Sequence, residues 1–142
     1  MVYILYSELT QKIDTLTHLL NRRSYESRLA SLRGHAVIYY FDVDEFKSVN
    51  DTFGHVAMAW ATRCLPRSAA RSTPCSPRSA SCYRIGGDEF CVIAQISDTA
   101  AEKYLSEFLR ELTARRVKNE HLPHVSVGYV CFNPVLGSVE DA

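Results

Sequence analysis

The chain has 142 residues, with 16 basic and 16 acidic side chains and a formal net charge of +0. This length is typical of a single domain. The balanced charge excludes a general attraction to nucleic acid, so an anionic ligand must be held by a local site. The apolar runs are too short to cross a bilayer, and the first residues lack the pattern of a secretory signal. We therefore expect a cytoplasmic segment without membrane contact.

The first part of the chain predicts two helices separated by a break. Apolar residues spaced four apart over 5–13 indicate a helix, and residues 1–13 are interpreted as the end of a linker helix from an upstream domain. The sequence 14–17, Asp-Thr-Leu-Thr, is typical of a break followed by a helix N-cap. A second helix is expected from about Asn21 to Leu32. Its predicted buried residues are Tyr25, Leu29 and Leu32.

The rest of the chain alternates strands and helices. The apolar run 35–43 predicts a central strand covered on both faces, and a short helical turn is expected over 45–50. Residues 83–85 and 89–96 predict a β-hairpin whose glycines, Gly86 and Gly87, supply positive φ angles. A helix over 100–116 and a strand over 125–130 complete an α/β (α+β) sandwich with a mixed central sheet flanked by helices. The predicted core positions of the helix over 100–116 are Tyr104, Phe108, Leu109 and Leu112.

One stretch does not fit this pattern. Residues 63–82 are rich in Arg, Ser and Pro, and no acidic residue occurs over 56–82. A low-complexity linker explains the composition, but a long structureless insert between two strands of one sheet is uncommon. The alternative is a reading-frame slip that begins near Met58 and is corrected near Cys82, because a shifted reading of residues 58–62 permits Gly-x-Gly-Asp. An uninterrupted genomic reading without compensating indels would exclude that hypothesis.

Two acidic motifs indicate a cation site. Asp42, Val43 and Asp44 lie at the C-terminal end of the predicted buried strand, and Asp88 and Glu89 lie at the predicted hairpin tip. Ligands gather beyond the carboxyl ends of strands in open α/β sheets. If the strands are neighbours, Asp42 and Asp88 converge, and their repulsion is relieved by a divalent cation such as Mg²⁺. Taken alone, each motif is more often a cap or a turn.

The motifs together resemble a known family. Four motifs occur in this order: Asp14-Thr-Leu-Thr-His-Leu-Leu-Asn-Arg-Arg, Phe41-Asp-Val-Asp-Glu-Phe-Lys-Ser-Val-Asn-Asp-Thr-Phe-Gly-His, Tyr83-Arg-Ile-Gly-Gly-Asp-Glu-Phe and Val125-Ser-Val-Gly. In this combination the chain resembles the GGDEF family of diguanylate cyclases, and residues 14–142 are interpreted as that domain. The resemblance implies a fold similar to nucleotidyl cyclase catalytic domains. It also implies the condensation of two GTP molecules into cyclic di-GMP, with pyrophosphate as the leaving group.

The resemblance also implies roles for individual residues. Mg²⁺ (or Mn²⁺) would be held by Asp42, the Val43 carbonyl and Asp88, while Glu89 would assist metal binding or activate the ribose 3′-hydroxyl. Phe46 and Lys47 would contact the phosphates, and Lys47 would also take part in catalysis. Asn50 would bind guanine. Gly86 and Gly87 would leave room for the nucleotide. Turnover in the family needs two such domains facing each other, so we expect a homodimer controlled by an upstream sensory domain.

This copy departs from the family pattern at three places. Gly54-His55 is followed by Val56-Ala57 rather than by the family's guanine-binding Asp, and the inhibitory Arg-x-x-Asp before the hairpin is missing. We also expect the domain to be incomplete at its C-terminus, without the family's last phosphate-binding helix. These departures predict a weak or inactive cyclase. The alternative is a degenerate domain that acts as a GTP-binding or protein-interaction module, and a third reading is a gene fragment without an independent role.

Overall fold

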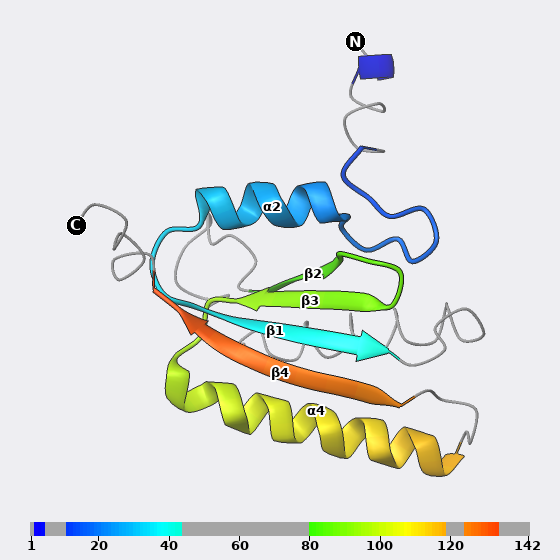
Figure 1. The fold of residues 1–142 in the computed structure, drawn as a ribbon, viewed down its shortest axis with the longest axis vertical. Coiled ribbons are helices and arrows are strands. Elements are labelled where there is room, and N and C mark those ends of the chain that lie inside the picture. Colours follow the sequence, from blue (N-terminus) through cyan, green and yellow to red (C-terminus); the bar gives the residue numbers. More distant parts are fainter. Residues whose placement is uncertain (1, 5–10, 44–79, 119–123, 134–142) are drawn as a thin grey trace.

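The computed structural model describes residues 2–4, 11–43, 80–118 and 124–133. Over these residues a four-stranded sheet lies between two helices, α2 (Arg22–Ser31) on one face and α4 (Asp98–Lys118) on the other (Figure 1). The expected class, a sheet flanked by helices, is confirmed. The expected turn over 45–50 and most of the unusual stretch 63–82 lie outside the described residues.

The strands are β1 (Ala36–Val43), β2 (Ala80–Arg84), β3 (Glu89–Ala94) and β4 (Val125–Phe132). Their order in the sheet is β2-β3-β1-β4, and each neighbouring pair is antiparallel. The four-stranded sheet is therefore antiparallel rather than mixed as expected; the parallel pairing found among the described residues is an isolated bridge between Leu20 and Tyr83, outside the named strands. The expected central strand is confirmed, because β1 has a hydrogen-bonded neighbour on both sides.

Helix α2 has the limits that its capping residues dictate. The Asn21 side chain accepts a hydrogen bond from the Ser24 N–H at 3.0 Å, which satisfies a free donor of the first turn. Leu32 is extended and ends the helix. The cap expected at 14–17 is instead a local turn, in which the Asp14 carboxylate accepts from the Thr17 N–H at 2.8 Å. A short side chain that accepts a hydrogen bond favours a turn as well as a helix cap. The first helix after this turn has Asn21 as its N-cap.

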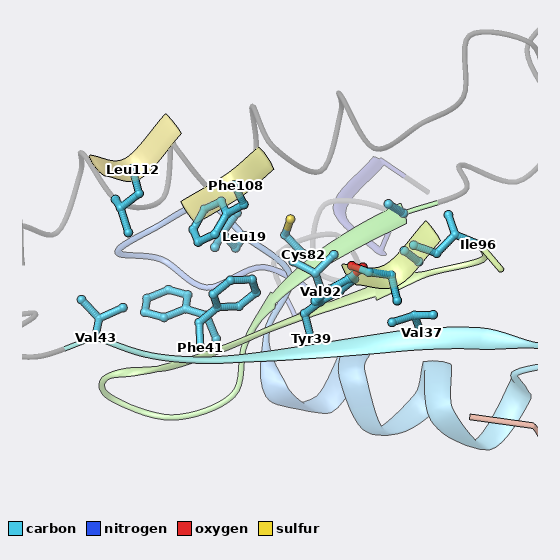
Figure 2. Close-up of a cluster of buried hydrophobic side chains, with 14 residues drawn as sticks. Leu19, Val37, Tyr39, Phe41, Val43, Cys82, Val92, Ile96, Phe108 and Leu112 are labelled. Carbon is cyan, nitrogen blue, oxygen red and sulfur yellow. The ribbon is translucent and has the colours of Figure 1, made fainter. Parts of the chain in front are cut away.

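The larger part of the core lies between the sheet and α4. Tyr39, Phe41 and Val43 point from β1 toward Phe108 and Leu112 (Figure 2). The Phe41 and Phe108 rings meet edge to face, with their centroids 5.1 Å apart. The prediction of Leu109 as a core residue is wrong, since this side chain is 39% exposed. Adjacent helical positions point about 100° apart, so burying Phe108 turns Leu109 toward solvent.

The opposite face of the sheet packs against α2. Its buried residues alternate with those of the first face along each strand, and Leu32, Ala36, Ile38, Tyr83, Cys91 and Ile93 form this smaller cluster. Tyr25 and Leu29, two of the three predicted core residues of α2, pack against it while remaining half-buried, and Leu32 is fully buried. Both faces of β1 are therefore covered, as its continuous apolar sequence predicts.

Two local expectations are wrong. The hairpin glycines do not need positive φ angles: among the described residues such angles occur only at Gly34 and at the non-glycine His18. The helix expected over 5–13 does not include its last positions, because residues 11–13 form a turn and an isolated bridge, whereas residues 5–10 lie outside the described part. No helix within the described ranges is both long and apolar enough to span a membrane.

Candidate functional site

The end of β1 and the β2–β3 hairpin tip lie side by side, as the acidic motifs predict (Figure 1). Asp42 lies opposite Glu89 in the antiparallel register, and the Val43 N–H donates to the Asp88 carbonyl at 2.9 Å. Opposite residues in such a ladder share a face of the sheet, so the Asp42 and Glu89 side chains project together. The register therefore places Glu89, rather than Asp88, directly across from Asp42, and Asp88 is one residue further toward the tip.

A surface cavity of about 490 Å³ lies over these carboxylates. Asp42 and Glu89 line it together with Ser126 of β4, which is the residue opposite Asp42 on its other side. Tyr40 forms another part of the wall, and its hydroxyl lies 2.8 Å from that of Tyr25 on α2. The cavity thus contains two acidic side chains and two hydroxyl groups, all of which offer oxygen atoms.

Asp42 and Glu89 are exposed and opposite each other in the register, and no cation of the described residues pairs with either. Neither Asp42 nor Glu89 has a salt-bridge partner in the described part of the chain. Like charges directly opposite on neighbouring strands destabilise a sheet. A bound cation would remove this repulsion, which is the physical reason to regard the pair as a candidate metal site.

The donor set fits Mg²⁺ bound together with a phosphate ligand. The described residues contain no group of three or more His, Cys, Asp or Glu side chains that could hold a metal. Mg²⁺ commonly takes only one or two protein carboxylates, and its other ligands are phosphate oxygens and water. Asp42 and one acidic residue of the hairpin would satisfy that requirement, and a carbonyl at Val43 is also an oxygen donor of the preferred kind.

At the hairpin tip, Gly86 is closely surrounded and Gly87 is open. A Cβ atom added at Gly86 would lie 3.0 Å from the Oε2 atom of Glu89, whereas one added at Gly87 would meet nothing within 4 Å. The Ile85 and Gly86 N–H groups both donate to the Glu89 carbonyl, at 2.9 and 3.2 Å. Gly86 thus allows the Glu89 carboxylate to lie against the turn, so a side chain at this position would displace it.

Arg84 fixes the hairpin tip to the loop before α2. Its guanidinium donates to the Gly87 carbonyl at 2.9 and 3.3 Å and to both carboxylate oxygens of Asp14 at 3.2 Å. Burial alone would raise the pKa of Asp14, but the hydrogen bonds from Thr17 and the positive charge of Arg84 hold that pKa below its ordinary value. The loop, the turn and the strand before it therefore form one connected unit beside the acidic pair.

The site also includes residues to which sequence reasoning gave no role. These residues are Tyr40, Ser126 and the Asp14–Arg84 ion pair, which lie in the recognised motifs or beside them. Their position near Asp42 follows only from the pairing of the strands in the sheet. Of the predicted residues, the structure brings together Asp42, Val43, Gly86, Gly87, Asp88 and Glu89. The other three, Phe46, Lys47 and Asn50, lie outside the described residues.

Comparison with known proteins shows the family to which the chain belongs. The family model described as "Diguanylate cyclase, GGDEF domain" matches residues 11–140. The chain is 35% identical over 133 residues to the probable diguanylate cyclase DgcC of Escherichia coli K12, covering 85% of this chain and 34% of the relative. It is 32% identical over 104 residues to the cyclic di-GMP phosphodiesterase PdeB of Shewanella oneidensis, covering 70% of this chain and 12% of that protein.

A structural comparison gives the same fold. The coiled coil and GGDEF domain of DgcB from Caulobacter crescentus, solved in complex with c-di-GMP, matches with a TM-score of 0.61 at 23% identity. The match covers 94% of this chain and 76% of that structure. The chain spans about a third or less of the length of the two curated relatives. By its sequence match and its fold, the chain belongs to the diguanylate cyclase GGDEF domain family.

Proposed function

We propose that this chain is a diguanylate cyclase domain, which condenses two GTP molecules into cyclic di-GMP and releases pyrophosphate, and that turnover in this copy is impaired. One observation carries the proposal. The antiparallel register brings Asp42 opposite Glu89, while the Val43 N–H donates to the Asp88 carbonyl. The two acidic motifs, which are 46 residues apart in sequence, thereby form one oxygen-rich edge. This is the chemistry that a nucleotide triphosphate with its divalent cation requires.

In this proposal Asp42, the Val43 carbonyl and Asp88 hold Mg²⁺ or Mn²⁺. When bound, the cation neutralises the triphosphate and stabilises the charge that develops on the phosphate oxygens. Glu89 faces Asp42 across the strands, and it would assist metal binding or accept the proton of the attacking ribose 3′-hydroxyl. The cavity beside the pair, with Tyr40 and Ser126 in its wall, would admit the substrate.

The remaining substrate contacts follow from the family pattern. Phe46 and Lys47 would contact the phosphates, Lys47 supplying a positive charge, and Asn50 would bind guanine. Gly86 and Gly87 would allow the nucleotide to approach the hairpin backbone. Each 3′-hydroxyl would attack the α-phosphate held by a second copy, so turnover requires a homodimer. In a longer protein an upstream sensory domain would control this pairing, and the active segment would face the cytoplasm.

The expected impairment rests on the guanine site. The residues after Gly54-His55 are Val56 and Ala57, where the family pattern continues toward an Asp that contacts guanine. A hydrogen bond to a charged group contributes about 1.5–3 kcal/mol. Its loss would lower the apparent GTP affinity or the rate about ten- to a hundredfold, since each 1.4 kcal/mol is about a factor of ten.

The proposal is tested by product formation. The purified chain is incubated with GTP and MgCl₂, and both pyrophosphate and cyclic di-GMP are quantified against Asp42→Asn and against Glu102→Gln as a matched control on α4. We expect slow, Mg²⁺-dependent formation of both products that Asp42→Asn abolishes and Glu102→Gln leaves unchanged. Product formation that Asp42→Asn does not affect would contradict the assignment of the site.

A second function, a GTP-binding or protein-interaction module without turnover, is favoured by the altered sequence after His55. It predicts Mg²⁺-dependent binding of GTP that never releases pyrophosphate, even at high protein concentration where dimers form. The two proposals therefore differ in one readout, because both require the acidic edge and only the cyclase requires bond formation at the α-phosphate.

A further inference from the structure

A second cavity lies on the other side of α2, away from the acidic edge. It has a volume of about 580 Å³, and none of the described residues that line it also lines the cavity beside Asp42. We call it the basic pocket. Its polar lining residues include Lys12, Arg23, Arg28, Ser24, Ser27 and Ser31. The half-buried Leu20 and the buried Tyr83 also line it, and its lining within the described part of the chain contains no acidic residue.

The three cations of the basic pocket have no partner in the described part of the chain. Ion pairs there engage Arg22, Arg84 and Arg115, but not Lys12, Arg23 or Arg28. Three unpaired positive charges around one cavity repel each other, and the repulsion is weakened only by water and salt. An anion in the cavity would turn that repulsion into attraction.

The three charges come from two neighbouring segments, the loop before α2 and α2 itself, and all of them line this one cavity. Arg23 lies in the first turn of α2, where the helix dipole is positive and no acidic residue offsets it. Lys12 is held beside this turn, because its carbonyl accepts from the Asn21 N–H and from the Ser24 hydroxyl, both at 2.9 Å. Figure 1 shows the loop that contains Lys12 next to the start of α2. Ser24, Arg28 and Ser31 continue the same face along the helix at spacings of three and four residues.

We propose that the basic pocket binds a small anion that carries two or more phosphate groups. Arg23 and Arg28 are five residues apart on α2, which separates them by about 7.5 Å along the axis. That spacing suits two phosphate groups better than one, and arginine forms paired hydrogen bonds to phosphate oxygens. The cavity also has the volume of a small-molecule site rather than that of a single ion. The serine hydroxyls add neutral donors between the charges.

This site does not depend on the proposed cyclase function, because its described lining contains no carboxylate that could bind a metal ion. The test is therefore performed on the full chain in EDTA, where nucleotide binding at the acidic edge should be lost. Binding of inorganic pyrophosphate and of inorganic phosphate is measured by isothermal titration calorimetry. We expect saturable binding of pyrophosphate, at least about tenfold tighter than that of phosphate, because two charged groups engage two arginines.

Substitutions locate the binding. Arg23→Gln and Arg28→Gln should each raise the Kd for pyrophosphate about tenfold, and the double variant should abolish binding. Arg22→Gln is the matched control: it removes the same charge from the same helix, but Arg22 pairs with Glu26 and does not line the pocket. Thermal unfolding verifies that the variants fold, as expected for side chains on the surface of α2.

The following outcomes would overturn the proposal. One is the absence of saturable pyrophosphate binding in EDTA by the folded chain. Another is an equal effect of Arg22→Gln and of the two pocket variants, since that would indicate general charge attraction rather than a site. Equal affinity for phosphate and pyrophosphate would exclude a ligand with two or more phosphate groups.

Discussion

Replacing Arg84 with glutamine tests how the hairpin tip is held beside the loop that precedes α2. The guanidinium donates to the Asp14 carboxylate at 3.2 Å and to the Gly87 carbonyl at 2.9 and 3.3 Å. The Arg84 and Asp14 side chains are only 13% and 20% exposed, so water screens their attraction less than at an open surface. Both partners would lose charged hydrogen bonds in a site that is partly closed to water.

The expected cost follows from these contacts. A hydrogen bond that involves a charged group contributes about 1.5–3 kcal/mol. We expect Arg84→Gln to lower the free energy of unfolding by about 3 kcal/mol and Asp14→Asn to lower it by about 2 kcal/mol. Because Arg84 has further partners besides Asp14, only a double-mutant cycle isolates the pair. We expect a coupling free energy of about 1–2 kcal/mol.

The assay is urea denaturation at neutral pH of the parent, both single variants and the double variant. Arg22→Gln serves as the control, because its pair with Glu26 is 73% and 62% exposed and should contribute less than about 0.5 kcal/mol. A coupling free energy below about 0.3 kcal/mol would refute the reasoning. In that case the ion pair would be incidental, and other contacts would hold the hairpin tip.

Three further predictions concern stability. Phe108→Ala should lower the free energy of unfolding by about 3–5 kcal/mol, because it opens a cavity against Phe41. Leu109→Ala should lower it by less than about 1 kcal/mol. Equal losses of stability in thermal denaturation would contradict the assignment of Phe108, and not Leu109, to the core face of α4. His18 has φ of 58°, so His18→Gly should stabilise the chain by about 0.5–1 kcal/mol, and a loss of stability in urea would exclude strain there. Folding lowers the pKa of Asp14. The stabilisation of the fold by its ionised carboxylate is therefore present above the ordinary pKa of 3.8 and is lost as the pH falls through the folded pKa. The stability difference between the parent and Asp14→Asn should shrink below pH 3.8, and a constant difference would contradict the lowered pKa.

Local sequence signals predicted the elements well where one physical cause dominates. The apolar sequence of β1 indicates burial on both faces, and the structure has helices on both sides of it. The limits of α2 were predicted to within one residue, because Asn21 is a strong N-cap. Leu109 was misplaced because periodicity alone does not distinguish two adjacent apolar residues when only one can face the sheet.

Contacts between distant segments were the part that sequence could not supply. Asp14 and Arg84 are 70 residues apart, and no local pattern indicates that they meet. The register of β1 against β3 also cannot be read from either strand alone, although a shift of one residue would reverse the face of every side chain. Motif recognition brought Asp42 and Asp88 together, but the register places Glu89 opposite Asp42.

The most direct test of the acidic edge is a calorimetric titration of GTP into the full chain with and without Mg²⁺. The proposed site predicts binding that requires Mg²⁺, is lost in Asp42→Asn, and persists in Glu102→Gln, whose side chain is exposed on α4. GTP binding that is equally strong in EDTA, or that Asp42→Asn leaves intact, would contradict a shared cation at the end of β1 and the hairpin tip.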